Sequence, residues 1–153
     1  MGSMSQGETP KTPNFIRAMV AGGAIVIAAG GGGIPVYVEP DGTYEGLDVV
    51  VDKDRAAAVL GREIGAQTLI ILTEVDQVAI NFGKSNERFI SKMTAREAKQ
   101  YYTEKHFPPG SMGPKIEAAL TFLEFGGEKV IITSIEKAAE AIDGHAGTLI
   151  LPD

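Results

Sequence analysis

The chain has 153 residues, of which 44% are hydrophobic and 22% are charged, and its formal net charge at pH 7 is -6. These proportions are typical of one folded domain and exclude an intrinsically disordered chain. The negative charge argues against general binding to nucleic acid or to anionic membranes, because it repels phosphate groups. The absence of cysteine excludes disulfides, thiol catalysis and cysteine-bound metals. We therefore expect a soluble, cytoplasmic protein with no nucleic-acid or membrane partner.

The chain begins with a polar segment. Residues 1–11 open with "MGSM", which is typical of vector sequence, so we expect a disordered lead there and a single domain over residues 12–153. Thr12 and Pro13 predict the start of a short helix, which Gly22 and Gly23 end. The apolar run Ala24–Ala29 follows, too short to span a bilayer, and predicts a strand.

The middle of the chain predicts a hairpin, a helix and a strand. A turn at residues 40–42, "PDG", between β-forming residues predicts a hairpin over residues 34–46. Asp52 is placed to cap a helix over residues 53–65, which Gly65 ends. The run "TLIIL" at residues 68–72 then predicts a buried strand.

The C-terminal third continues this alternation. A second strand pair is expected around residues 77–82, and Thr94 with Glu97 predicts a capping box for a helix over residues 95–102. Another helix should start with Pro114 in its first position and stop at residues 126–127. Strands at 129–133 and 148–152 flank a helix at 135–142. Such alternation predicts an α/β fold, a mainly parallel sheet in a three-layer αβα sandwich.

The segment "PPGSMGPKIEAAL", residues 108–120, contains a candidate anion site. The free amides at a helix start and the helix dipole both favour an anion, and Lys115 would add a full positive charge. The alternative is that the glycines and Pro114 simply turn the chain into a helix.

Three further features fall at predicted strand ends, where open α/β folds bind ligands. The four glycines Gly30, Gly31, Gly32 and Gly33 expose backbone amides, or else allow two backbones to cross closely. Lys53 lies between Asp52 and Asp54 at a helix start, where a carboxylate could orient its ammonium group. Thr73, Glu74 and Asp76 follow a buried strand. Amides, ammonium groups and carboxylates gathered in this way suit phosphoryl transfer.

The sequence predicts no metal site made by protein side chains. Its two histidines, His106 and His145, are too far apart in sequence to form a metal motif, and we interpret them as ordinary surface or loop residues.

Six segments, in order, resemble the C-terminal half of carbamate kinase, a member of the amino-acid-kinase superfamily. They are "AAGGGGIPV", "VDKDRAAAVLG", "LILTEVDQVAINFGK", "HFPPGSMGPKIEAA", "FGGEKVIITS" and "GHAGTLI". The resemblance implies an amino-acid-kinase-like αβα fold and reversible phosphoryl transfer, ATP + carbamate to ADP + carbamoyl phosphate, with this chain as the ATP-binding half. It also implies ATP or ADP with Mg²⁺ as cofactor, and a role in arginine catabolism.

The resemblance also implies roles for individual residues. Lys53 and Lys115 would contact the transferring phosphoryl group and the nucleotide phosphates, with Asp54 orienting the lysines. The glycines at 30–33 would lie on the side of the substrate and the γ-phosphate. The nucleotide-binding residues would be Thr73, Val75, Asp76, Asn81, Phe82, Met112, Gly113 and Lys115.

The chain departs from the carbamate kinase pattern in two respects. It has no counterpart of the N-terminal half, whose glycine-asparagine-alanine loop and protruding lysine hold carbamate. Glu74 stands where the family usually has an aspartate, and Gln77 stands where it usually has a small or variable residue.

Three hypotheses follow: an active kinase; a nucleotide-binding fragment or half of a split enzyme; and a structural domain that binds no nucleotide. We expect a homo-oligomer or a missing N-terminal half, and Lys115→Ala should weaken ATP binding with little change in stability.

Overall fold

The computed structural model describes residues 11–29, 31 and 35–153. Of the predicted disordered lead, residues 1–11, residues 1–10 lie outside the described part, and Lys11 is the first residue of a helix. Helices and strands are interspersed along the chain, with runs of consecutive strands in its first two thirds and two consecutive helices before the last strands. In order they are α1 (Lys11–Ala21), β1 (Val36–Val38), β2 (Tyr44–Gly46), α2 (Lys53–Ile64), β3 (Thr68–Thr73), β4 (Val78–Ile80), β5 (Arg88–Ile90), β6 (Lys92–Thr94), α3 (Ala95–Thr103), α4 (Met112–Glu124), β7 (Lys129–Ser134), α5 (Ala138–Ile142) and β8 (Thr148–Leu151).

The main sheet has four strands in the order β3-β7-β8-β6. β3 and β7 are parallel, as are β6 and β8, whereas β7 and β8 are antiparallel. Two of the three pairings in this sheet are therefore parallel, which agrees with the predicted mainly parallel sheet. The ends of β3 and β7 fall at the same edge, because Thr73 pairs with Ser134.

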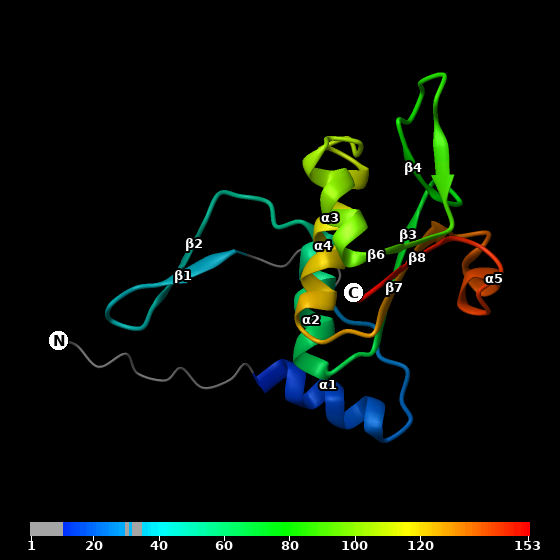
Figure 1. Cartoon of the computed structure of the whole chain (residues 1–153). Helices are drawn as coiled ribbons and strands as arrows, with labels where there is room; N and C mark the ends of the chain where they lie inside the picture. The colour runs from blue at the N-terminus through cyan, green and yellow to red at the C-terminus, as the bar shows by residue number, and fades with distance from the viewer. Residues whose placement is uncertain (1–10, 30, 32–34) are drawn as a thin grey trace.

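The two faces of the sheet are covered unequally. α2, α3 and α4 pack on one face, where Val130, Ile132 and Ile150 meet the fully buried Ile116 and Phe122 of α4. The alternate residues of β7 point to the opposite face, which in the described chain is contacted by the short helix α5 (Figure 1). The αβα layering is thus present, with a sparse second layer in the part described.

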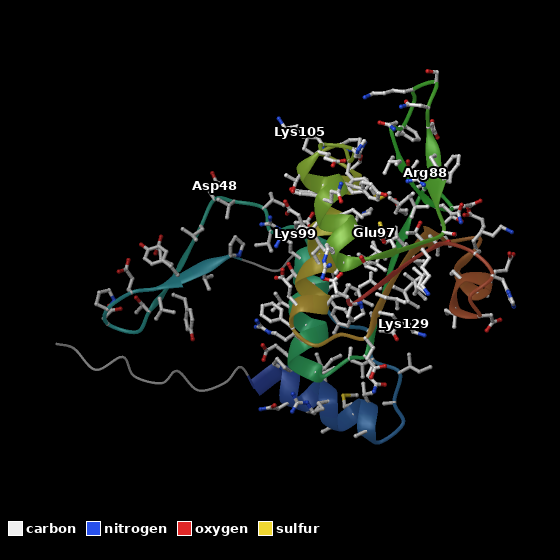
Figure 2. All side chains as sticks on the ribbon, in the orientation of Figure 1. Asp48, Arg88, Glu97, Lys99, Lys105 and Lys129 are labelled. Carbon is white, nitrogen blue, oxygen red and sulfur yellow. The ribbon has the colours of Figure 1, made fainter. Side chains whose placement is uncertain are left out.

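The helix ends follow from local sequence in two cases. The Asp52 side chain accepts hydrogen bonds from the amides of Asp54 and Arg55 at the start of α2, and Gly65 ends the helix in a left-handed conformation with φ 73°. Thr94 and Glu97 form the predicted capping box of α3; Figure 2 labels Glu97 at that end. Such caps satisfy amides that otherwise have no partner within the helix.

The start of α4 differs from the prediction. The helix begins at Met112, so Pro114 occupies its third position rather than its first. The carbonyl of Pro108 accepts hydrogen bonds from the amides of Ser111 and Gly113, at 3.3 and 2.9 Å. The preceding turn therefore continues directly into the helix, because Pro108 already satisfies amides of its first turn.

The strand predicted at Ala24–Ala29 is wrong. This apolar segment is not assigned to a strand, and Ile25 and Ile27 are each 98% exposed. A strand requires a neighbour to satisfy its backbone groups and cover its side chains, and none of the described residues supplies one. The predicted hairpin does form, from β1 and β2, and it projects away from the helices (Figure 1).

No helix among the described residues combines the length and apolar character that crossing a membrane would require. The second predicted strand pair is also present, as the antiparallel pair β4 and β5.

Candidate active site

A buried ion pair joins the first turns of α2 and α4. Lys115 donates from Nζ to Asp54 Oδ2 at 2.9 Å, and each residue is only 8% exposed. Asp54 lies in the first turn of α2 and Lys115 in the fourth position of α4, and the two helices pack against each other. The amino ends of two helices therefore meet at one charged pair, and each contributes a positive partial charge there.

The second predicted lysine lies beside this pair but in solvent. Lys53 Nζ is 3.8 Å from the same Asp54 oxygen, and its side chain is 69% exposed. Of the three residues that we predict to be catalytic, two are thus fixed by burial and the third can move. One carboxylate contacts both ammonium groups, as the sequence interpretation of Asp54 requires.

The burial of Lys115 changes the expected result of removing it. A buried charge is costly without its counterion, and breaking a buried pair typically costs about 3–5 kcal/mol. Lys115→Ala would leave the buried Asp54 carboxylate with only the exposed Lys53 ammonium group, 3.8 Å away, as a charged partner. The structure therefore predicts a loss of stability, contrary to the nearly unchanged stability expected from the sequence.

A second cross-link holds the same two helices together. Glu117 of α4 accepts hydrogen bonds from Arg55 of α2 and from the Tyr102 hydroxyl of α3. These bonds, first Tyr102 and then Arg55, lower the pKa of Glu117, and the bond to Glu117 raises the pKa of Arg55. Arg55 and Glu117 are neighbours of Asp54 and Lys115, so this link fixes how the two helix starts face each other. No local sequence pattern indicates this link, because Arg55 and Glu117 are 62 residues apart.

An apolar pocket of about 220 Å³ lies next to α4. It brings together four of the predicted nucleotide-binding residues, Thr73, Val75, Phe82 and Met112. Thr73 and Val75 come from the carboxyl end of β3, Phe82 follows β4, and Met112 begins α4. Glu74 and Gln77, which the sequence analysis considered, also line it. Sequence reasoning did not assign its remaining lining residues, Ala79, Pro108 and Ser111, to the site.

Two other predicted nucleotide residues, Asp76 and Asn81, line hollows that share Phe82 with this pocket, whereas, among the described residues, Gly113 and Lys115 line none of these cavities. The Asp76 carboxylate accepts a hydrogen bond of 2.5 Å from the Ser134 hydroxyl, and Asp76 lines a shallower hollow that also contains Phe82. Asn81, with φ 56°, lines an adjoining pocket of about 750 Å³ between Phe82 and the end of α3. Asp76 and Asn81 therefore lie outside the pocket lined by the four residues but share neighbours with it, Val75 and Phe82 for Asp76 and Phe82 for Asn81.

The structure describes two of the glycines of the predicted site, Gly31 and Gly113. The amide of Gly113 already donates to Pro108, so it is not one of the free amides expected at this helix start. A Cβ added at Gly113 would lie 3.0 Å from the Pro108 oxygen, which explains the need for glycine there. Gly31 belongs to the described part, whereas Gly30, Gly32 and Gly33 lie outside the described residues.

The described residues contain no group of three or more His, Asp or Glu side chains that could hold a metal ion. His106 Nε2 lies 3.1 Å from Glu104 Oε2 on the surface, which fits its interpretation as an ordinary loop residue. His145 follows α5 and is exposed.

The sequence profile of the amino acid kinase family matches residues 4–134. The chain belongs to this family. Among curated proteins it is similar to the carbamate kinases of Thermococcus kodakarensis (47% identity, covering 87% of this chain and 42% of the relative) and Pyrococcus furiosus (46%, 90% and 43%). The expected resemblance to carbamate kinase is confirmed.

The fold comparison agrees. A structure of the Giardia lamblia carbamate kinase bound to AMP-PNP matches with a TM-score of 0.87 at 36% identity, covering 92% of this chain and 49% of that one. A UMP kinase from Bacillus anthracis, 15% identical with a TM-score of 0.60, shares the fold alone. The chain spans less than half the length of the curated relatives it matches.

Proposed function

We propose that this chain binds ATP or ADP and supplies the nucleotide-binding part of a carbamate kinase-like phosphotransferase, which converts ATP and carbamate reversibly to ADP and carbamoyl phosphate. The observation that carries this proposal is the buried Lys115–Asp54 pair at the amino ends of α2 and α4. A cation held at two helix starts suits phosphate oxygens, because the dipoles and the ammonium charge act together.

The apolar pocket beside α4 would take the adenosine end of the nucleotide. Thr73 and Val75 approach it from β3 and Met112 from α4, while the exposed ring of Phe82 offers a face for stacking. Since Met112 is three residues before Lys115 on the same helix, a nucleotide in this pocket would direct its phosphates along the first turn of α4. The match to a carbamate kinase bound to AMP-PNP supports nucleotide binding by this chain.

Lys115 and Lys53 would neutralise phosphate charge in different ways. Lys115 is fixed by Asp54 and would hold a phosphate oxygen in a constant position, whereas exposed Lys53 could follow the phosphoryl group as it moves. Phosphoryl transfer depends mainly on such positioning and on electrostatic stabilisation. Mg²⁺ would arrive with the nucleotide and offset its charge. The glycines at 30–33 would lie on the substrate side.

Calorimetric titration tests nucleotide binding directly. We expect Mg-ATP and Mg-ADP to bind more tightly than AMP or adenosine, because Lys53 and Lys115 act on the distal phosphates. Equal affinity for adenosine and ATP would contradict the proposed role of the lysines. Saturation by no adenosine ligand would favour a structural domain.

A second candidate function is a nucleotide-binding polypeptide that does not turn over alone, either a fragment or one half of a split enzyme. The exposed apolar side chains of Ile25, Ile27 and Val50, each 98% exposed, favour it, because such surface is usually covered. Loss of substrate positioning can remove orders of magnitude in rate while nucleotide contacts remain.

A coupled assay for ATP formation from ADP and carbamoyl phosphate separates the two candidates. Turnover by this chain alone at about 1–100 per second, the ordinary range for kinases, would show that the chain is an active kinase without a further half and would exclude the second candidate. Binding of ADP without turnover, followed by recovery of turnover when a separately made N-terminal half of a carbamate kinase relative is added, would establish the second.

A further inference from the structure

A second hollow lies on the face of the sheet opposite to α2, α3 and α4. It has a volume of about 300 Å³ and is bounded by β6, β7, β8 and the turn that follows α5. Its floor is apolar: Ile131 and Leu149 are paired neighbours on β7 and β8, and Ala141 and Ile142 of α5 close one side. None of the residues that we assign to the nucleotide line this hollow.

The rim of the hollow is positive in an acidic protein. Lys92, Lys129 and His145 line it, together with the hydroxyl-bearing Ser91, and no aspartate or glutamate lies among its lining residues. Within the described chain, the side chains of Lys92, Lys129 and His145 form no hydrogen bond or ion pair with another side chain. An apolar floor beneath unpaired cations suits a molecule with an apolar body and an anionic end.

The hollow is physically connected to the candidate nucleotide pocket through Gln77. Gln77 lines both cavities, and its Nε2 donates a hydrogen bond of 3.1 Å to the backbone oxygen of Gly147. Gly147 belongs to the turn between α5 and β8 that walls the hollow.

This turn has little freedom to move independently. Gly147 has φ 80°, and a Cβ added there would lie only 3.1 Å from Thr133 Cβ and 3.3 Å from Ala141 Cβ. A ligand that displaces the turn must therefore disturb the hydrogen bond from Gln77, because Thr133 and Ala141 pack too closely against Gly147 for the turn to move alone.

We propose that this hollow binds a small organic anion with an apolar body, and that Gln77 couples its occupancy to nucleotide affinity. The anionic end lies at Lys92 and Lys129 and the apolar body rests on Ile131 and Leu149. The binding site itself does not depend on the proposed function, whereas the coupling rests on it. The coupling is reciprocal: an anion that weakens ADP binding is itself bound more weakly when ADP is present.

Titration with phenylpropionate, followed by the backbone amide resonances of Gly147 and Leu149, tests the site. The matched neutral probe is phenylpropionamide, which has the same body without the charge. We expect saturable shifts with phenylpropionate, much weaker shifts with the amide, and a loss of affinity of at least about tenfold in the double variant Lys92→Gln/Lys129→Gln, because two charge-assisted contacts are removed. Lys99→Gln, on α3 at the other face, is the control and should bind as wild type does.

Equal binding of the charged and neutral probes, unchanged affinity in the double variant, or absence of saturable shifts would overturn the site. These readouts need no nucleotide, so they remain valid if the chain binds no ADP. For the coupling, ADP affinity is measured with and without saturating phenylpropionate in wild type and in Gln77→Ala. A change in wild type that disappears in Gln77→Ala supports the link, and an equal ratio in both proteins overturns it.

Discussion

Residues 11–52 and residues 53–153 differ in how much apolar surface they bury. Among the described residues, Pro13 and Ile16 are the buried apolar side chains of the first region, whereas the other buried hydrophobic side chains all lie between Ala58 and Ile150. The first region nevertheless contains eight large hydrophobic side chains that are at least 50% exposed: Phe15, Val20, Ile25, Ile27, Val38, Tyr44, Val49 and Val50. Apolar composition alone therefore does not produce a core.

The two regions differ in whether strands and helices pair with and cover their apolar segments. Segment Ala24–Ala29 and strand β3 have similar apolar sequences, but β3 pairs along six residues with β7 and is covered by α2 and α4. The earlier segment has no such neighbour in the described chain and remains exposed. Strand propensity reflects packing against neighbours more than an intrinsic backbone preference.

The largest expected effect comes from removing a phenylalanine in the second region. Phe122 is 1% exposed, and its ring lies against Gly61 and Gly127. Phe122→Ala should lower the free energy of unfolding by about 3–5 kcal/mol, through lost burial and the cavity left behind. The matched control is Phe15→Ala in α1, where the ring is 67% exposed and the loss should be below about 0.5 kcal/mol. Urea unfolding followed by circular dichroism measures both, and similar losses in the two variants would remove the distinction between the regions.

The exposed surface of the first region should cause self-association. Light scattering is expected to give a mass above that of one chain, because Ile25 and Ile27 expose apolar surface on a segment that pairs with no strand among the described residues. The double variant Ile25→Lys/Ile27→Lys should lower this mass, whereas Ile135→Lys/Ile142→Lys, at exposed positions of the second region, should leave it unchanged. A strictly monomeric wild-type chain would contradict this expectation.

A smaller effect concerns the link between α2 and α4. The pKa of Glu117 is lowered by its hydrogen bonds to Tyr102 and Arg55. Because the folded pKa lies below the unfolded one, near 4.5, the stabilisation is present above that pH and disappears as the pH falls through the folded pKa. We expect Glu117→Gln to cost less than about 1 kcal/mol at pH 7, since the side chain is partly exposed, and to flatten the acid branch of the stability profile. Glu45→Gln in the hairpin is the control. If Glu117→Gln leaves the loss of stability at acid pH unchanged, the Glu117 carboxylate does not contribute to that pH dependence.

Much of the fold was predictable because local signals are strong where helices begin and end. Asp52 and Gly65 set the limits of α2, and Thr94 with Glu97 sets the start of α3, through contacts within a few residues. The failure at Ala24–Ala29 has the opposite cause. Whether an apolar run becomes a strand depends on a neighbour that its own sequence does not encode.

In the candidate site too, the local sequence predicted the residues but not the contacts between distant segments. Residue types and order indicated Lys53, Asp54, Lys115 and the pocket residues, but their distances depend on how α2 packs against α4. The Arg55–Glu117 link and the contact from Gln77 to Gly147 each join segments more than 60 residues apart, so no local pattern reveals them. The roles that we assign to the site residues remain predictions until binding is measured.

The central claim is that the buried cation at the start of α4 binds nucleotide phosphate. The most direct test is the calorimetric affinity for Mg-ADP of Lys115→Ala and of the double variant Lys115→Met/Asp54→Leu, which removes both charges and avoids leaving one buried alone. We expect both to bind at least about tenfold more weakly than wild type, as for a lost charge-assisted contact, while Lys99→Ala binds normally. If the folded double variant binds Mg-ADP as tightly as wild type, Lys115 and Asp54 serve only to join two helices and the account is wrong.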